Sequence, residues 1–210
     1  IEGADPLRMD IYVEVDWVGQ RPFPNGSLDR LVRHYAQAPV ENPDGSTGVT
    51  LHVVVDDSVP ARDTIYPNPT TGEGINDVNE IRNRYFDHEG KGYHYGVVVP
   101  DVGSMSEPYA GVYVGESTFL VGRQGDRRAT LSIFAHELGH SLGLLPEVFE
   151  GIDSYERGFG KYPSVMNYDA PYDHINFTST DDGRTKYVEN GSGFDDWEYL
   201  ERLLWTPPTS

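Results

Sequence analysis

HELGHSLG, residues 136–143, is the most informative stretch of this 210-residue chain. It contains the pattern HExxH, in which His136 and His140 are four residues apart. On an α-helix this spacing gives about 6 Å of rise and nearly one full turn, so both imidazoles face one side and can share a cation. Glu137 follows the first histidine, where its carboxylate can reach a metal-bound water without ligating the metal. The stretch therefore predicts half of a zinc site together with its general base.

The flanking sequence predicts a helix over residues 127–142. Asp126 can cap its N-terminus, and apolar residues follow at helical spacing. Gly143 suits the left-handed residue that often ends a helix, and Pro146 prevents an easy continuation. The alternative interpretation is an ordinary amphipathic helix with two hydrogen-bonded, half-buried histidines.

Two motifs resemble the signature of the metzincin zinc proteases. HELGHSLG matches the first eight positions of HExxHxxGxxH. SVMNY, residues 164–168, looks like the Met-turn that lies beneath the metal in that clan. Looser similarity to prokaryotic, haloarchaeal, secreted metzincin-like proteases occurs upstream, in residues 10–17, 42–45 and 51–54. The resemblance therefore spans most of the chain, although the upstream matches carry no catalytic residue.

This resemblance implies an α/β (α+β) fold of the zincin or metzincin type. In such a fold a twisted mixed β-sheet, a backing helix and the active-site helix precede an irregular C-terminal lobe, which holds the Met-turn and a closing helix. It also implies one catalytic Zn²⁺ ligated by His136 and His140, with Glu137 as general base for the hydrolysis of peptide bonds in polypeptide substrates.

The third metal ligand is left open by the signature. Pro146 stands where metzincins have a histidine or an aspartate, and proline offers only a backbone carbonyl. Asp153 and Glu147 are the leading candidates to replace it. Glu150, His174 or no protein ligand are the remaining alternatives. Each acid also has a plain interpretation as a solvated loop carboxylate.

The resemblance also assigns roles within the Met-turn. Met166 is implied to form a hydrophobic floor beneath the imidazoles, because a thioether is a soft ligand that suits an N/O site poorly. Tyr168 stands at the position of a tyrosine that, in astacin-like and serralysin-like enzymes, reaches the zinc or the developing oxyanion. The alternative for Tyr168 is a packed aromatic ring with its hydroxyl in solvent.

Composition limits the class of protein. With 37% apolar residues, the chain can form a substantial core, and we expect a single metalloprotease catalytic domain over residues 1–210. Its N-terminal lobe, 1–143, would hold the sheet and the HExxH helix, and its C-terminal lobe, 144–210, the Met-turn and the closing helix. The absence of cysteine excludes disulfides and thiolate ligands. No apolar run is long enough to span a membrane. We expect a monomer.

Net charge is the second large feature. Sixteen basic residues against thirty-four acidic ones give −18, which disfavours nucleic acid and anionic membranes as partners. Such a surface repels itself in dilute buffer, whereas molar salt shortens the Debye length to about 3 Å. We therefore expect a halophilic, extracellular protein whose signal or propeptide has been removed before Ile1. The competing interpretation is a secreted protease with Ca²⁺ at the acidic pairs 56–57, 181–182 and 195–196, although no calcium loop of known spacing is present.

Further elements follow from local patterns. Residues 10–18 alternate as a half-buried strand would, and Ser27 can cap a helix through Ala36. Other elements are expected as strands at 50–55 and 93–99 and helices at 75–85 and 194–205. By resemblance, residues 110–121 include the strand whose edge binds the substrate backbone, the alternative being an ordinary hairpin arm.

Three functions remain open at this point. The first is a zinc endopeptidase whose specificity is set by residues 169–177, which do not reveal the preferred side chain. The second is a catalytically decayed zincin-fold binding protein that lacks a complete zinc site. The third is a hydrolase of another amide bond.

Overall fold

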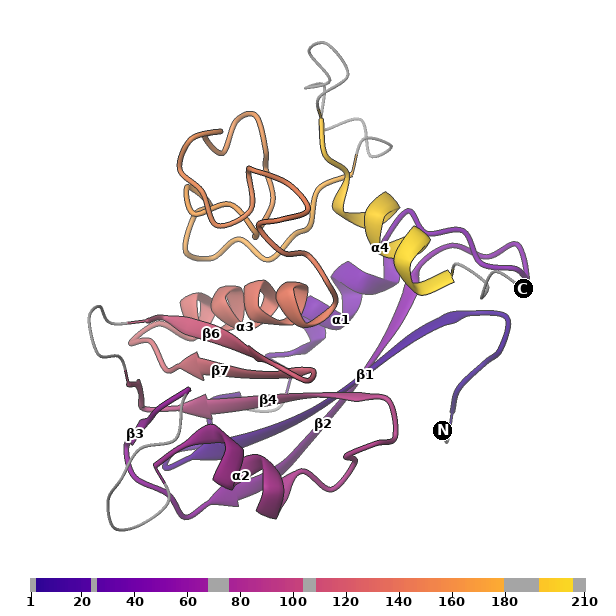
Figure 1. Ribbon diagram of the computed structural model, residues 1–210. Coiled ribbons are helices and arrows are strands. Elements are labelled where there is room, and N and C mark those ends of the chain that lie inside the picture. Colours follow the sequence, from indigo (N-terminus) through magenta and orange to yellow (C-terminus); the bar gives the residue numbers. More distant parts are fainter. Residues whose placement is uncertain (1–2, 24–25, 68–75, 104–108, 180–192, 206–210) are drawn as a thin grey trace.

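The computed structural model describes residues 3–23, 26–67, 76–103, 109–179 and 193–205 (Figure 1). At its centre is a five-stranded sheet with the order β2-β1-β4-β7-β6. The first four of these strands are parallel, and β6 runs antiparallel to β7 at one edge. The strands are β1 (Met9–Val18), β2 (Val49–Val59), β4 (Tyr93–Val99), β6 (Gly111–Gly115) and β7 (Thr118–Gly122), with β3 (Thr64–Ile65) and β5 (Asp101–Val102) as a separate parallel pair.

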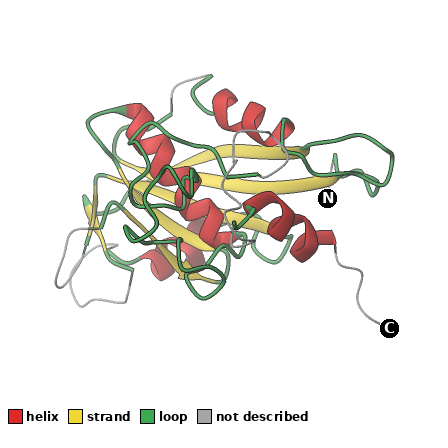
Figure 2. Cartoon of the chain, turned by 90° about the horizontal axis from the view of Figure 1, so that it is seen from above, coloured by secondary structure: helices red, strands yellow, loops and turns green. Residues whose placement is uncertain are grey.

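Helices cover both faces of this sheet. The view in Figure 1 shows α1 and α3 on one side and α2 on the other, and Figure 2 shows the helical layer over the strands from above. The segment after α3 folds back over that helix before α4 begins. The four helices are α1 (Asp29–Ala36), α2 (Val78–Tyr85), α3 (Arg127–Ser141) and α4 (Asp196–Trp205). Among the described residues, none of these helices combines the length and the apolar character needed to cross a bilayer.

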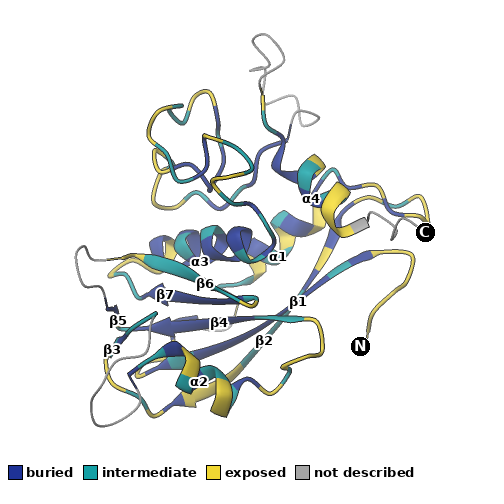
Figure 3. Ribbon diagram, in the orientation of Figure 1, coloured by how far each residue is buried: buried dark blue, intermediate teal, exposed yellow. Residues whose placement is uncertain are grey.

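Two apolar clusters fill the spaces on either side of the sheet. The larger joins Val13 of β1 and Phe134 of α3 to Met166 and Trp197, so the C-terminal part of the chain shares its core with the sheet. The smaller lies beneath α2 and includes Ile81. Burial on both faces is what a parallel sheet requires, and Figure 3 shows β4 and β7 as almost wholly buried.

The prediction that the first strand is half-buried is wrong. Glu14 and Asp16 of β1 have no exposed surface, although their alternation with apolar residues suggested a solvated face. Their carboxylates are buried because nearby groups satisfy them. Glu14 accepts hydrogen bonds from the backbone N–H groups of Asp87 and His88 at 2.9 and 3.0 Å, and Asp16 accepts one from the Tyr95 hydroxyl at 2.6 Å.

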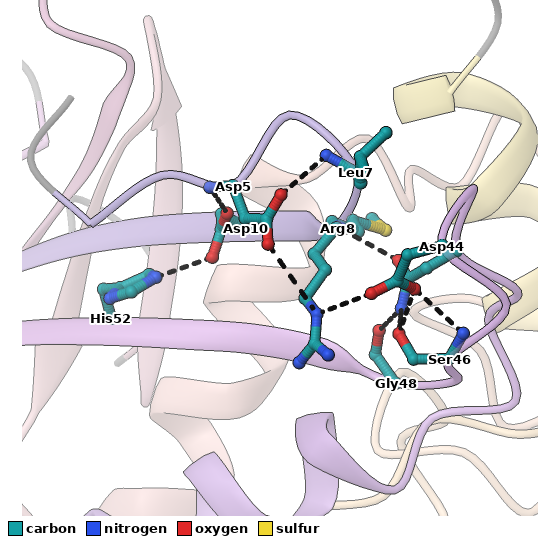
Figure 4. Close-up of polar contacts among 10 residues, drawn as sticks. Asp5, Leu7, Arg8, Asp10, Asp44, Ser46, Gly48 and His52 are labelled. Carbon is teal, nitrogen blue, oxygen red and sulfur yellow. Dashed lines mark hydrogen bonds and ion pairs between the residues drawn. The ribbon is translucent and has the colours of Figure 1, made fainter.

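The start of β1 is tied to the turn that precedes β2 (Figure 4). Arg8 Nε donates to Asp44 Oδ2 at 3.0 Å, and the backbone N–H of Met9 donates to Asn42 Oδ1 at 2.9 Å. A little further along, Asp10 pairs with His52 at 2.7 Å. These contacts hold the parallel register of β1 and β2 from its first residue pair.

Helix starts differ from expectation in three places. The N-cap of α1 is Leu28, which makes no side-chain cap, so the prediction that Ser27 caps this helix is wrong. The N-cap of α2 is Asp77, whose carboxylate accepts from the N–H of Glu80 at 2.9 Å. The earlier start expected at residue 75 lies outside the described residues. The closing helix α4 begins at Asp196, two residues later than expected.

The segment expected as a strand over residues 110–121 forms the hairpin β6–β7. Its two connecting residues, Glu116 and Ser117, have φ of 48° and 59°. Positive φ at both positions gives the tight turn whose twist matches that of the flanking strands. The hairpin places β6 at the edge of the sheet, beside α3 (Figure 1).

Candidate metal centre

The ends of α3 are fixed by the residues that the sequence indicated. Asp126 caps its start by accepting a hydrogen bond from the N–H of Arg128 at 2.8 Å, as predicted. At the other end Gly143 has φ 107°, and the N–H of Leu144 donates to the carbonyl of Gly139 at 3.0 Å. This is the Schellman arrangement, which needs a left-handed residue after the helix. It turns the chain so that Leu144 comes back against the last turn of α3.

Both imidazoles of the HExxH motif are held by backbone carbonyls. His136 Nδ1 is 2.8 Å from the carbonyl oxygen of Val165, and His140 Nδ1 is 2.7 Å from that of Leu144. Because a carbonyl oxygen can only accept, each Nδ1 carries the hydrogen. The lone pairs of the neutral rings are therefore on the two Nε2 atoms, which lie 3.0 Å apart. Outer hydrogen bonds of this kind orient histidines that ligate metals.

Asp153 completes a group of three converging ligand atoms. Its Oδ1 is 3.0 Å from Nε2 of His136 and 3.2 Å from Nε2 of His140. The residue has φ 54°, and its N–H donates to the carbonyl of Met166 at 3.0 Å. These three side chains form the one group of potential metal ligands found in the described part of the chain.

The donor set fits a zinc ion. Oδ1 of Asp153 is buried without a hydrogen-bond partner, and it faces two imidazole nitrogens that have no hydrogen of their own in the neutral ring. Three acceptor atoms that converge without a donor require a cation or added protons. Two nitrogens and a carboxylate oxygen, with no soft sulfur ligand, are a set that Zn²⁺ accepts and that leaves a position for water or substrate.

The pKa shifts of His136 and Asp153 also indicate that this group favours a bound cation. Burial by itself would lower the pKa of His136, but Asp153, Glu137 and the Val165 carbonyl outweigh it and raise the pKa to about 9. Burial would raise the pKa of Asp153, yet the imidazoles of His136 and His140 hold it well below its usual range. The site therefore favours a positive charge at the point where the three side chains meet.

Glu137 lies next to this group, and its carboxylate occupies space that is open because Gly111 has no side chain. Its side chain is buried, and Oε2 has no hydrogen-bond partner. A Cβ atom on Gly111 of β6 would lie only 2.6 Å from Oε1, so this carboxylate needs a glycine opposite it. Burial raises the pKa of Glu137, partly offset by His136 and His140. A buried carboxylate of raised pKa is suited to accepting a proton.

Residues 164–168, which resemble a Met-turn, pack against the backbone of α3. Met166 has no exposed surface, and a Cβ on Gly139 would lie 2.4 Å from its Sδ and 2.8 Å from Cε1 of Phe177. The carbonyl of Val165 holds one imidazole, and that of Met166 holds the backbone of Asp153. The main chain of Val165 and Met166 thus positions two of the three candidate ligands.

A buried aspartate that sequence reasoning missed anchors residues 162–166. Asp196, at the start of α4, accepts hydrogen bonds from the hydroxyls of Tyr162 and Ser164 at 2.5 Å each. It also accepts one from the N–H of Thr178 at 2.8 Å. Ser164 Oγ in turn accepts from the N–H of Met166 at 3.1 Å. Burial raises the pKa of Asp196 to about 7.

The acidic pairs considered for calcium have different surroundings. Asp56 and Asp57 are exposed, and Asp181 and Asp182 lie outside the described residues. Asp196 is one member of the third pair, but its oxygens are occupied by protein donors. The signal that could have indicated its role is an acid at the start of an amphipathic helix whose next residue is a core tryptophan.

Tyr168 lies beside the ligand group. Its ring stacks on that of His136 with centroids 5.9 Å apart, and the ring of Tyr155 is 5.3 Å from it on the outside. The side chain is 48% exposed, so the hydroxyl can meet a bound molecule. Burial, Asp153 and Glu137 raise the pKa of Tyr168 to about 12, which keeps the hydroxyl a hydrogen-bond donor.

The other candidate ligands lie elsewhere. Glu147 is exposed, and Glu150 pairs with Arg157. His174 Nε2 is 3.3 Å from the carbonyl oxygen of Pro163. None of these three belongs to the group of converging ligand atoms found among the described residues.

Comparison with known proteins gives a fold-level similarity. No protein-family model and no curated protein sequence matches the chain. Among solved structures, the fold is similar to archaemetzincin from Methanopyrus kandleri, with 15% sequence identity and a TM-score of 0.45. The match covers 92% of this chain and 96% of that one.

Proposed function

We propose that this protein is a zinc-dependent endopeptidase. The observation that carries the proposal is the convergence of Nε2 of His136, Nε2 of His140 and Oδ1 of Asp153, with the carboxylate of Glu137 beside them. Metal ligands, a buried base and a phenol donor at one place are the components of metal-assisted hydrolysis.

Each residue has a distinct role in the proposed reaction. When bound, zinc supplies a Lewis acid and lowers the pKa of its water toward ~7. Glu137 accepts a proton from the attacking water and passes it to the leaving nitrogen, acting first as base and then as acid. Tyr168 donates a hydrogen bond to the carbonyl oxygen as negative charge develops there. Met166 takes no part in the proton transfers and supports the imidazoles from below.

The proposed substrates are polypeptides that bind along β6. This strand lies at the edge of the sheet and borders Glu137 through Gly111. An extended peptide can add to such an edge by backbone hydrogen bonds, which would bring one peptide bond to the metal centre. Residues 169–177 would form the wall of the specificity pocket, where Tyr172 is 83% exposed.

The proposed setting is extracellular and saline, and the proposed working unit is a monomer in which residues 1–210 act as one catalytic domain. The net charge of −18 supports the saline setting, because a folded chain of this charge is relieved of self-repulsion by screening ions.

The decisive experiment combines metal analysis with a mixed peptide library. The chain is purified in concentrated sodium chloride and offered Zn²⁺, and its zinc content is measured by mass spectrometry. We expect one zinc per chain and cleavage at internal peptide bonds, both removed by a chelator. Tight zinc binding without any cleavage would support the decayed binding protein, and cleavage confined to terminal or non-peptide amides would support another amidohydrolase. No zinc binding by the folded chain would refute the proposal.

A further inference from the structure

A cavity lies between α1, the segment 175–179 and α4. It has a volume of about 400 Å³, within the range of small-molecule sites. The residues on which the argument depends are Arg30, Arg33, His34, Asn176, Phe177 and Trp197. None of them belongs to the group formed by the two HExxH histidines and Asp153.

The lining of this cavity is basic although the chain is strongly acidic. Arg30 and Arg33 are three residues apart on α1, so they lie on adjacent turns of one face. The described lining contains no carboxylate. Both arginines are exposed, and within the part of the chain that the structure describes neither guanidinium group has an ion pair or a hydrogen bond. Two arginines at one cavity, in a chain with more than twice as many acids as bases, mark a local reversal of charge.

His34 adds a neutral hydrogen-bond donor between the arginines and the wall. Its Nε2 accepts a hydrogen bond from the N–H of Phe177 at 3.1 Å, which assigns the ring hydrogen to Nδ1. Burial, with His174 and Arg30, lowers the pKa of His34 to about 4, so the ring is uncharged at neutral pH. The positive charge of the cavity therefore comes from the two guanidinium groups.

An aromatic wall closes the cavity on its inner side. Trp197 and Phe177 are 2% and 4% exposed, and their ring centroids are 5.3 Å apart in an edge-to-face arrangement. The ring of His34 is 5.6 Å from that of Trp197. Because these packed rings are almost wholly buried, only a small part of each reaches the cavity, where they form a rigid floor.

We propose that this cavity binds a small organic anion, a molecule that carries a carboxylate or phosphate group on an apolar body. Arg30 and Arg33 hold the anionic group, because guanidinium matches the geometry of carboxylate and phosphate oxygens. The apolar body enters toward the floor of the cavity, where Trp197 and Phe177 expose only a small part of their rings. The cavity shares Asn176 and Phe177 with the segment proposed as the specificity wall, but it contains none of the three proposed zinc ligands, so anion binding can be tested independently of protease activity.

The test is a titration followed by two-dimensional ¹H–¹⁵N NMR at constant ionic strength. The probes are benzoate for the carboxylate, phenyl phosphate for the phosphate, and benzyl alcohol as a neutral molecule of similar body. The indole signal of Trp197 is assigned from a Trp197→Phe variant. We expect saturable shifts of this signal and of the Phe177 amide with at least one of the two anions and not with benzyl alcohol. Absence of saturable shifts with both anions, or equal shifts with benzyl alcohol, overturns the proposal.

Two matched double variants separate the cavity from general electrostatics. R30Q/R33Q removes both cavity charges, and R62Q/R128Q removes the same charge from two exposed arginines outside the lining. We expect anion affinity to fall at least about tenfold in the first and to change less than about twofold in the second. Equal affinity in the two variants, with circular dichroism showing both folded, refutes the assignment.

Discussion

The carbonyl oxygen of Leu144 lies 2.7 Å from Nδ1 of His140, four residues earlier in the chain. This contact exists because Gly143, with φ 107°, reverses the backbone directly after α3. The same residue thus ends the helix and fixes the ring hydrogen of a proposed metal ligand. The glycine of the HExxHxxG stretch has, in this chain, a chemical role as well as a conformational one.

Gly143→Ala should therefore weaken zinc binding. An alanine in this left-handed conformation costs about 1–2 kcal/mol, and the displaced turn would move the Leu144 carbonyl away from His140. We expect the zinc dissociation constant, measured by competition with a chromophoric chelator, to rise roughly 10–100-fold. Gly90→Ala is the matched control, because Gly90 has φ 72° and nothing near its missing Cβ. If both variants bind zinc as the parent does, the Leu144 contact does not support the metal site.

Glu137→Gln should abolish catalysis and leave the metal in place. The amide has nearly the shape of the carboxylate but cannot accept the proton of the attacking water, which is worth roughly 10²–10⁴-fold in rate. We expect kcat/KM on a cleaved peptide to fall by at least that factor, with unchanged zinc content. A variant that retains peptidase activity would exclude Glu137 as the base.

Asp153→Ala should lose zinc, whereas Glu147→Gln should not. Asp153 is the carboxylate that meets both imidazoles, while Glu147 is exposed. We expect the first change to weaken zinc binding by more than the roughly 10–100-fold that follows loss of an outer partner. Equilibrium dialysis of the two variants side by side measures this. The opposite ranking would assign the third ligand to Glu147.

The free energy of unfolding should fall as pH rises toward neutrality. Burial raises the pKa of Asp196 to about 7, so the folded chain retains a proton that the unfolded chain, with its ordinary pKa near 3.8, has lost. The native state then binds one more proton than the unfolded chain between these values. The contribution of this proton to stability is fully present below pH ~4 and is lost as pH rises through ~7. Urea unfolding with a chelator present, at several pH values, measures the slope. We expect Asp196→Asn to flatten it and Glu147→Gln to leave it unchanged; equal slopes in all three proteins would contradict the assignment.

Salt should stabilise the chain through screening rather than through calcium. Raising sodium chloride from 0.1 to 1 M shortens the Debye length from about 10 to 3 Å, so repulsion among the excess acids decreases. We expect the melting temperature to rise steadily over this range. Millimolar CaCl₂ should add no more than NaCl of equal ionic strength, and a separate saturable increase with calcium would favour the calcium-loaded alternative.

Much of the fold was predictable where the determinants are local. The helix α3, its cap at Asp126 and its end at Gly143 are confirmed, because each depends on residues within one or two turns. The strands around residues 10–18, 50–55 and 93–99 are confirmed as well. The cap at Ser27 is wrong, and the hairpin turn at Glu116–Ser117 was not recognised because it lacks the usual glycine or asparagine.

In the candidate site too, the features with local determinants were predictable from the sequence and the others were not. The spacing of His136, Glu137 and His140 predicted their shared face, since four residues on a helix determine it. Which acid meets them depends on how the loop after Gly143 folds back, and sequence distance does not determine that. Asp196 anchors residues 18 to 34 positions earlier in the chain, and the basic cavity joins α1 to segments more than a hundred residues later, so no local pattern marks either feature. The assignment of the ligands, the base and the two lobes remains a prediction for experiment.

Asp153 adopts φ 54°, a left-handed conformation that only glycine, asparagine and aspartate accept at little cost. Of these three, glycine brings no ligand and asparagine brings no charge. The backbone conformation of the loop and the charge of the proposed zinc ion therefore both favour aspartate, for independent reasons. Hardly any substitution of Asp153 would preserve both the backbone conformation and the negative charge.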